Sequence, residues 1–284
     1  MSFSLKILGS AAAEGIPAVF CGCETCRKAR KNGGKDLRFR TSYILNERVR
    51  VDYGPDAIAQ DFKFQLNSEL IRHIFITHPH LDHFTPELFL FRRWDSMVPE
   101  GNTLSVYGSR GTIAKMMECF WGTTWFDGDL KGFQLETVIF EYFKTIYPAG
   151  EDMEVIPLPA SHYFDCPYIE PAIYVIRSGD KWIFLANDTG AFPAETWKFL
   201  EEKKFKFDIV VCDCTWGTRT NDSGHLGGEC ILDVKKRLEK IGSVTTDTKF
   251  AVNHFTHNCH ATHAELEEYF NPHGILVGYD GMEL

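Results

Sequence analysis

Short runs of apolar, β-rich residues recur along the whole chain, separated by polar turns or by helical patterns. Such runs predict β-strands, and we expect them near residues 3–9, 42–46, 48–52, 72–76, 104–107, 154–158, 173–178, 181–185, 208–212, 249–252 and 275–277. Apolar residues three or four positions apart predict α-helices, which we expect near residues 55–65, 84–94, 109–120, 193–203, 228–239 and 262–270. Thr262 and Glu265 have the spacing of a capping box at the start of the last helix. Strand pairs precede the helices in the first half, which favours packed sheets flanked by helices over a barrel of alternating strands and helices.

The chain contains no internal repeat or low-complexity tract, so we expect one domain over residues 1–284. Residues 95–150 differ from the rest because they are rich in aromatic side chains, such as Phe120, Trp121 and Phe126, and carry few candidate catalytic groups. We interpret this segment as an insertion. Two roles for it stay open, a helical cover over the core and a lid or subunit contact, since aromatic patches often serve recognition.

Four potential metal ligands stand within six residues directly after the predicted strand 72–76. The sequence there reads Thr77-His78-Pro79-His80-Leu81-Asp82-His83. A strand that runs into a tight polar turn delivers imidazole and carboxylate groups to the end of a sheet, where a rigid backbone can hold two cations close together. A single His-x-His pair in a loop is common, but four ligands at this spacing indicate a metal-dependent hydrolase.

Three further candidate ligands follow other predicted strands. His162 comes after residues 155–161, Asp188 after residues 182–187, and His254 after residues 250–253. Repeated placement at strand ends gathers residues that are far apart in the sequence at one sheet edge. The sequence therefore predicts a binuclear centre, in which two cations share a hydroxide, lower its pKa and bind oxygens of the substrate. Imidazole and carboxylate ligands accept Zn, Mn or Fe, and the metal identity stays open between these.

These motifs, taken in order, resemble those of the metallo-β-lactamase superfamily over most of the chain. The resemblance implies a four-layer αββα sandwich of class α/β, with the site at the sheet edges between two similar halves. It also implies the distribution of ligands: one metal would take His78, His80 and His162, the other Asp82, His83 and His254, and Asp188 would bridge both. Asp52 matches the superfamily's early aspartate and would support the ligands without binding metal. A turn or capping acid is the alternative role for Asp52.

Nine cysteines include three within one short loop, Cys21, Cys23 and Cys26. An odd count in a chain of this size argues against a disulfide framework and favours a reducing cytoplasm. Three thiolates at this density predict a closed structural zinc site, which needs a fourth ligand. His257 is our candidate, three residues after His254, while His260 and His263 are competitors. We assign none of the remaining cysteines, including Cys166, a nucleophilic role and expect small buried residues there.

The cysteine loop together with His254-x-x-His257 is similar to one branch of the superfamily, the phosphodiesterases associated with carbon-phosphorus lyase. That resemblance implies hydrolysis of small cyclic or nucleotide-like phosphodiesters, a manganese-type catalytic pair and a separate structural zinc. It also implies that Asp82 and His225 are catalytic, with His225 protonating the leaving group. A helix-capping or loop role is the alternative for His225. The aromatic segment 95–150 and the residues 212–216 depart from the branch.

The net charge of the chain limits which classes of binding partner we expect. Thirty basic and thirty-nine acidic residues give a net charge of −9, which argues against the extended phosphate contacts that nucleic-acid binders make. We therefore expect a small anionic phosphodiester as substrate and no extended nucleic acid. No apolar run of about 18 residues predicts a membrane span, the start of the chain lacks a convincing cleavage site, and we expect a cytoplasmic protein. The aromatic segment leaves a homodimer open.

Other functions compete with the phosphodiesterase. A hydrolase of another ester class, such as a thioester, lactone or β-lactam, keeps the fold, but the cysteine loop argues against it. A diiron oxidoreductase is disfavoured, because the superfamily branches of that kind carry an acidic residue at the position of His80. A non-catalytic carrier for cofactor biosynthesis is disfavoured because the predicted metal ligands are intact. A transfer-RNA nuclease is disfavoured by the acidic balance.

Overall fold

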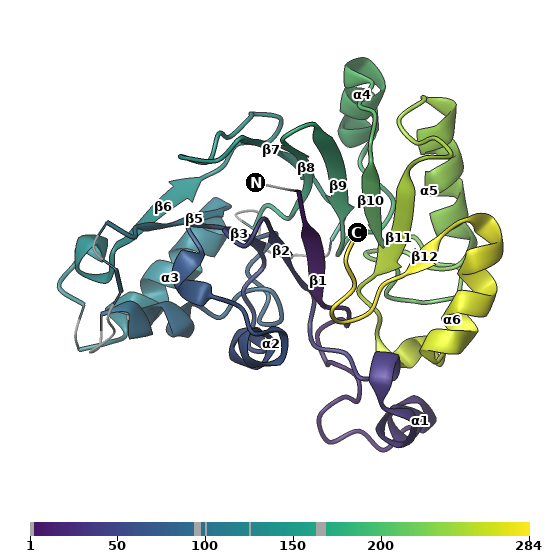
Figure 1. Ribbon diagram of the computed structural model, residues 1–284, viewed down its shortest axis with the longest axis horizontal. Coiled ribbons are helices and arrows are strands. Elements are labelled where there is room, and N and C mark those ends of the chain that lie inside the picture. Colours follow the sequence, from purple (N-terminus) through teal and green to yellow (C-terminus); the bar gives the residue numbers. More distant parts are fainter. Residues whose placement is uncertain (1–2, 94–97, 100, 125, 163–168) are drawn as a thin grey trace.

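Two six-stranded β-sheets pack face to face, with helices on their outer faces (Figure 1). The structure, a computed structural model, describes residues 3–284 apart from 94–97, 100, 125 and 163–168. Cys166 and its expected burial therefore lie outside the described residues. The helix, sheet, sheet, helix order of the layers confirms the predicted αββα class.

The first sheet contains strands from the amino-terminal half. Its order is β1 (Leu5–Gly9), β2 (Ser42–Leu45), β3 (Val49–Val51), β4 (His73–Phe75), β5 (Leu104–Gly108) and β6 (Leu135–Ile139). The pairs β1–β2 and β2–β3 are antiparallel, whereas β3 to β6 are parallel. The carboxyl ends of the parallel strands consequently meet at one edge of the sheet.

The second sheet repeats the same pairing pattern with later strands. It consists of β7 (Met153–Pro159), β8 (Ala172–Ser178), β9 (Lys181–Ala186), β10 (Ile209–Asp213), β11 (Lys249–Asn253) and β12 (Leu276–Val277), neighbours in that order. The pairs β7–β8 and β8–β9 are antiparallel and β9 to β12 are parallel. The two halves thus have similar topology, as the resemblance implied.

Helices cover both outer faces of the sandwich. The α-helices are α1 (Glu24–Asn32), α2 (Ala57–Phe64), α3 (Arg110–Trp121), α4 (Ala194–Lys203), α5 (Glu229–Lys240) and α6 (His263–Phe270). Short 3₁₀ turns are η1 (Gly34–Asp36), η2 (Ser68–Leu70), η3 (Pro86–Arg92), η4 (Leu130–Phe133), η5 (His257–Cys259) and η6 (Asn271–His273). Thr262 and Glu265 form the predicted capping box at α6. Within the described ranges, each helix is too short or too polar to cross a membrane.

Buried apolar side chains form three layers of core. Side chains from both sheets, among them Val51, Phe75, Tyr174 and Val211, fill the space between the sheets. A second cluster joins the second sheet to α4, α5 and α6, and a third joins the first sheet to α3 and η3. Since each fully buried aliphatic or aromatic side chain contributes about 1.5–3 kcal/mol, these layers fix the sheet edges that carry the candidate site.

The structure differs from the predicted elements in three places. Helix α1 was not predicted, and it begins inside the cysteine loop with Cys23 as its N-cap. The helix expected over 84–94 is a 3₁₀ segment, η3. Residues 95–150 contain β5 and β6, so the described part of this segment completes the first sheet as well as supplying α3 to cover it.

Candidate metal centre

The turn after β4 closes on a single carbonyl group. The His80 carbonyl accepts the N–H groups of His83 (3.2 Å) and Phe84 (2.9 Å). Asp52, which follows β3 on the neighbouring strand, accepts the Thr77 N–H (2.8 Å) and the Thr77 hydroxyl. The loop between Thr77 and Phe84 is therefore tied to the end of the adjacent strand, and its imidazole and carboxylate groups lie at the carboxyl edge of the sheet.

One group of candidate ligands combines residues of both halves. The ligand atoms of His78, His80, His162 and Asp188 all lie within 4.8 Å of one another. The His80 Nδ1 atom lies 2.9 Å from His78 Nε2 and 3.1 Å from His162 Nε2, and Asp188 Oδ2 lies 3.1 Å from His78 Nε2. Three imidazoles and a carboxylate around one point suit a divalent cation.

A second group shares Asp188 with the first. It brings the ligand atoms of Asp82, His83, Asp188 and His254 within 4.8 Å of one another. All four residues are at most 6% exposed. The His83 Nε2 atom, the His254 Nε2 atom and Asp188 Oδ1 are buried and form no well-aligned hydrogen bond among the described residues, although a group of opposite charge lies within 4 Å of each. Because buried polar atoms are rarely left without a well-formed partner, a bound divalent cation would suit these three atoms.

The strand ends reach this centre through strained backbone. Asp52, Asp188 and His254 have φ angles of 63°, 54° and 68°, a left-handed region that residues with a side chain seldom occupy. Asp52 and His254 directly follow β3 and β11, and one residue separates Asp188 from the end of β9. Such conformations persist where surrounding structure determines them, and they concentrate at functional sites.

The carboxylates make the centre strongly negative. Burial alone lowers the pKa of His83, but Asp82 and Asp52 outweigh burial and hold that pKa well above its usual value. Burial likewise lowers the pKa of His254, whereas Asp188, Asp213 and Asp82 raise it to about 9. A field that retains protons on buried imidazoles also favours binding of a divalent cation in their place, because both carry positive charge.

Each half uses a buried aspartate and a threonine to orient its histidines. In the first half, His83 Nδ1 donates to Asp52 Oδ2 (2.7 Å), and His78 Nδ1 lies 3.0 Å from the Thr77 hydroxyl. Nδ1 is thereby engaged and Nε2 of both rings faces the centre. This contact places Asp52 where the resemblance implied, although its effect on metal binding stays a prediction.

The equivalent group of the second half was not predicted. Asp213, the last residue of β10, is fully buried and accepts N–H groups from Asp188, Thr215 and Leu226 at 2.8–3.0 Å. The Thr215 hydroxyl donates to Asp213 and lies 2.8 Å from His254 Nδ1. Because Asp213 follows residues 209–212 as Asp52 follows 49–51, its strand-end position was the signal available in the sequence.

His225 lies beside this group. Its Nδ1 atom is 3.1 Å from Asp188 Oδ1 and 3.3 Å from Asp213 Oδ2, and its side chain is 25% exposed. Burial lowers the pKa of His225, but Asp188 and Asp213 raise it to about 10. Although Asp188, Asp213, His225 and His254 lie close enough to hold a cation, the oxygens of Asp213 already accept several donors. We therefore interpret Asp213 as an orienting group.

The thiolate cluster forms at the predicted loop. Ligand atoms of Cys21, Cys23, Cys26 and His257 all lie within 4.8 Å of one another, and His257 Nδ1 is 3.6 Å from Cys21 Sγ and 3.4 Å from Cys23 Sγ. Three thiolates and one imidazole suit a closed structural zinc site. His257 Nε2 lies 3.9 Å from the Glu14 carboxylate. In many zinc sites a carboxylate in this position orients the ligating histidine.

The competitor histidines lie elsewhere. His260 is exposed, and His263 receives a hydrogen bond from Arg38 (2.9 Å) and donates one to Glu267 (2.9 Å). Burial and the nearby Arg38 lower the pKa of His263 to about 4. Neither residue belongs to the thiolate cluster among the described residues.

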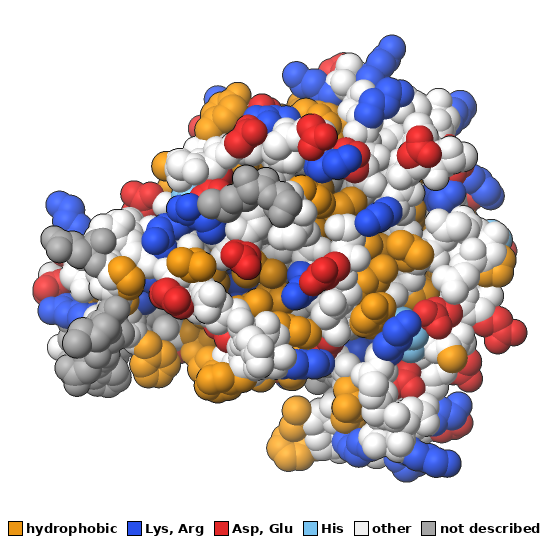
Figure 2. Space-filling view, in the orientation of Figure 1, with side chains coloured by type: hydrophobic (Ala, Val, Ile, Leu, Met, Phe, Trp, Pro, Cys, Tyr) orange, Lys and Arg blue, Asp and Glu red, His pale blue; other side chains and the backbone are white. Residues whose placement is uncertain are grey.

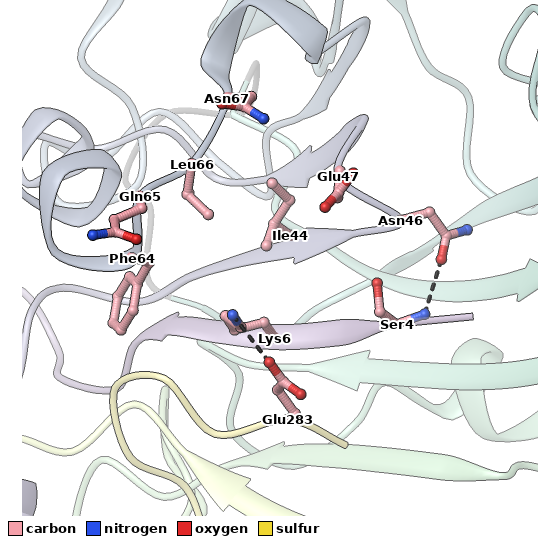
Figure 3. Close-up of a pocket in the computed structure, with 10 residues that line it drawn as sticks. All are labelled: Ser4, Lys6, Ile44, Asn46, Glu47, Phe64, Gln65, Leu66, Asn67 and Glu283. Carbon is pink, nitrogen blue, oxygen red and sulfur yellow. Dashed lines mark hydrogen bonds and ion pairs between the residues drawn. The ribbon is translucent and has the colours of Figure 1, made fainter. Parts of the chain in front are cut away.

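Two cavities differ in their relation to the clusters. A cavity of about 530 Å³ lies between β1, β2 and the residues after α2, where Lys6 pairs with Glu283 and Ser4 donates to Asn46 (Figure 3). No predicted site residue lines it. A second cavity of about 330 Å³ adjoins the metal centre through His162, and its lining residues are Ser161, His162, Ala191, Asp222, Ser223 and Gly224.

An αββα sandwich with histidine and aspartate clusters at its sheet edges is a metallo-β-lactamase-like protein. The chain belongs to the beta-lactamase superfamily, since the model of the beta-lactamase superfamily domain matches residues 47–251. This confirms the superfamily that the motifs resembled.

Solved structures share the fold over the full chain. A diphosphatase from the PhnP family is 23% identical, with a TM-score of 0.74, and the match covers 100% of this chain and 97% of that one. Zinc-bound PqqB from Methylobacterium extorquens is 15% identical with a TM-score of 0.69, over 99% of each chain. Unliganded yeast PDE1 is 12% identical with a TM-score of 0.66, over 99% of each chain.

A curated relative matches only a short stretch. An octanoyltransferase from Porphyromonas gingivalis is 32% identical over 81 residues, which are 27% of this chain and 15% of the relative. The chain thus matches a small part of that protein's length, and the shared stretch carries no argument about its activity.

Proposed function

We propose that this protein is a binuclear metal-dependent phosphodiesterase that hydrolyses a small cyclic or nucleotide-like phosphodiester. The observation that carries the proposal is the sharing of Asp188 between two ligand groups, with His225 beside the same carboxylate. Two bound cations would activate water and neutralise the oxygens of a phosphoryl group. Mn, Zn and Fe all suit these ligands.

The chain supplies a set of ligands for each cation. His78, His80 and His162 would hold one ion, while Asp82, His83 and His254 would hold the other, with Asp188 common to both. Asp52, Thr77, Asp213 and Thr215 orient the rings that face the ions. Buried side chains on rigid strand ends keep this geometry before substrate binds, which lowers the cost of organising the reaction.

His225 would protonate the leaving oxygen. Its partly exposed ring lies beside the shared carboxylate and next to Gly224, which lines the 330 Å³ cavity. A histidine held near two carboxylates keeps its proton until an alkoxide forms, and it can then transfer that proton. Asp213 and Asp188 would hold the ring in position.

The cavity supports a small substrate. Its volume suits a small ligand, and Ser161, Ser223 and Asp222 are among the residues that line it. On the face shown in Figure 2, acidic and basic side chains are interspersed, which gives no support to extended contacts with a nucleic acid. The proposal also includes a cytoplasmic location and no membrane partner, and it leaves a homodimer open.

The comparisons add support at the level of the fold. The names of two neighbours, a diphosphatase of the PhnP family and yeast PDE1, are consistent with cleavage of phosphorus–oxygen bonds on this scaffold. The thiolate cluster would hold a structural zinc and tie the amino-terminal loop to the segment that carries His254.

Elemental analysis combined with hydrolysis of bis(p-nitrophenyl) phosphate tests the proposal. The protein should hold two metals at the centre and a third at the thiolate cluster. Asp82→Ala should abolish turnover and lose catalytic metal but keep the zinc. Three bound metals without diester turnover would instead indicate another ester class or a carrier.

The leaving group tests the role of His225. A p-nitrophenolate leaves without much help, whereas the alkoxide of a 2′,3′-cyclic nucleotide needs a proton. We expect His225→Ala to reduce turnover of the cyclic nucleotide about 10²- to 10⁴-fold and that of the nitrophenyl ester far less. Equal effects on both substrates, with both metals bound, would exclude a general acid role.

A further inference from the structure

Helix α3 places an ammonium group against the backbone of the loop at residues 77–84, here called the metal-ligand loop. Lys115 Nζ donates to the Pro79 carbonyl oxygen at 2.6 Å and to the Phe84 carbonyl oxygen at 3.0 Å. These two carbonyl groups flank residues 80–83, which carry three candidate ligands. One side chain from another element thus joins the two ends of this segment.

Helix α3 is a rigid support for that contact. Ser109 caps its first turn by accepting the Thr112 N–H. Its buried apolar side chains, Ile113, Met116 and Phe120, lie in the third core cluster. The same cluster contains Ile74 of β4, Phe84 of the metal-ligand loop and Phe89 of η3. Side chains delivered from packed helices position a site more closely than side chains on free loops do.

Other bonds tie this loop to the end of β3, including one from the Thr85 N–H to the Tyr53 carbonyl at 2.9 Å, but they engage other carbonyl groups than those of Pro79 and Phe84. The His80 carbonyl closes the turn, and the His83 carbonyl accepts the Tyr53 N–H at 2.8 Å. The carbonyl groups of Pro79 and Phe84 receive Lys115. Because hydrogen bonds from a charged donor are stronger than neutral ones, loss of the ammonium would remove the strongest side-chain contact to the backbone at the two ends of the segment and leave the bonds to Asp52 and Tyr53.

A competing effect has the opposite sign. An ammonium close to the centre repels bound cations, so its removal would strengthen metal binding if repulsion dominated. The charge of Lys115 is directed into two carbonyl oxygens and is opposed by the carboxylates of Glu87 and Asp82. We therefore expect the ordering of the loop to outweigh the repulsion, and the sign of the measured change in metal affinity decides between them.

We propose that Lys115 is a positioning residue that holds the segment 80–83 for binding of the catalytic cation at Asp82 and His83. The inference deepens the proposed function and rests on it. Groups that orient metal ligands typically change metal affinity or activity about 10- to 100-fold when removed.

Metal affinity of purified variants tests the inference. Lys115→Met removes the donors and keeps an unbranched side chain that is one atom shorter, Lys115→Arg keeps a charged donor, and Lys131→Met is a control at an exposed lysine of η4. Mn²⁺ affinity at the catalytic centre is measured by competition with a chelator. Zinc content of the thiolate cluster and the thermal midpoint of the metal-free protein are measured in parallel.

We expect Lys115→Met to weaken Mn²⁺ binding about 10- to 100-fold, with unchanged zinc content, and we expect Lys115→Arg to recover part of that loss. Wild-type affinity or tighter binding in Lys115→Met overturns the inference while leaving the proposed function intact. Failure of the wild-type centre to bind metal overturns both. If Lys115→Met does not fold, wild-type affinity in a folded Lys115→Ala variant overturns the inference, and weakened binding supports it.

Discussion

The two clusters of candidate ligands are joined by the segment from His254 to His257, yet they are built in different ways. The catalytic cluster takes ligands from the ends of strands in both sheets, and its Asp82, His83, Asp188 and His254 are buried. The thiolate cluster takes ligands from a loop, the first turn of α1 and η5, and only Cys26 among them is buried. Its cation would itself connect those pieces of chain.

This difference separates function from stability. The packed sheets hold the catalytic ligands whether or not cations are bound, so loss of those cations should remove activity and spare the fold. The loop at residues 18–26 has little core of its own, so loss of a zinc from the thiolate cluster should loosen it. Structural zinc sites contribute to folding directly, and variants in each cluster distinguish these two outcomes.

The largest effect is expected at the carboxylate shared by both catalytic ligand groups. Asp188→Ala removes a ligand from each group and leaves several imidazoles without their counter-charge. A bound cation pair contributes several kcal/mol to catalysis, and about 1.4 kcal/mol corresponds to a factor of ten. We expect at least a roughly thousandfold loss of diester turnover and loss of catalytic metal, measured by kinetics and elemental analysis.

The thiolate cluster provides the control for that variant. Zinc at Cys21, Cys23, Cys26 and His257 should be retained in Asp188→Ala. Asp180→Asn, in the turn between β8 and β9, should keep both activity and metal. Loss of all metals together from Asp188→Ala would contradict the separation of the two clusters.

A second, smaller effect is expected from Cys23→Ser. Serine can retain the N-cap contact that Cys23 Sγ makes with the Cys26 N–H, so the variant removes mainly the thiolate. Burial raises the pKa of Cys23, but the Cys26 N–H and the side chains of His257 and Cys21 lower it to about 6. This thiol is consequently ready to bind zinc near neutral pH.

We expect Cys23→Ser to lose one metal and to reduce turnover by less than about tenfold, below the range for groups that contact a metal ligand directly, because this cluster is connected to the catalytic ligands only through the segment from His254 to His257. Amide hydrogen exchange should increase over residues 18–32 and stay unchanged in β9 and β10. Unchanged exchange in residues 18–32 after zinc loss would show that the loop holds itself in place.

The sequence predicted which of these side chains would come together because each follows a run of residues that is plainly rich in apolar β-forming residues. His162, Asp188 and His254 become neighbours since parallel strands end at one edge of a sheet. Strand β6 was missed because its side chains are only partly buried and its pattern is weak. Helix α1 was missed because its cysteines indicated a metal loop.

Contacts between distant elements had no comparable signal. Lys115 reaches the metal-ligand loop only because α3 packs behind β4, and a lysine on a helix normally indicates a solvated surface. Asp213 and Thr215 repeat the pairing of Asp52 and Thr77 in the other half, which becomes visible only when the two sheets are compared.

Asp52→Asn and Asp213→Asn compare the orienting groups of the two halves. Asp52 accepts the His83 Nδ1 proton at 2.7 Å, while Asp213 lies 3.3–3.4 Å from His225 and His254. We expect either variant to weaken catalytic metal affinity or turnover about 10- to 100-fold. Only Asp213→Asn should act more strongly on a cyclic nucleotide than on the nitrophenyl ester, because it also contacts His225. The same substrate preference in Asp52→Asn would remove this distinction.

The smallest effect is expected at His263, which lies near the thiolate cluster in sequence but serves the scaffold. Its pKa falls from 6.5 to about 4 because of burial and Arg38, so the folded protein holds it neutral. The unfolded chain binds one more proton between these values, and stability from this residue is complete above pH 6.5 and declines as the pH falls toward 4. We expect His263 to contribute about 1–3 kcal/mol to the free energy of unfolding, which is less than the full pKa difference corresponds to because solvent screens part of the interaction.

His263→Gln should therefore flatten the dependence of unfolding free energy on pH between about 4.5 and 6.5. Chemical denaturation of the metal-free variant and wild type measures this slope without interference from metal release. His260→Gln, at an exposed position, is the matched control and should keep the wild-type slope. A wild-type slope in His263→Gln would mean that His263 titrates alike in the folded and unfolded states, which would contradict this prediction.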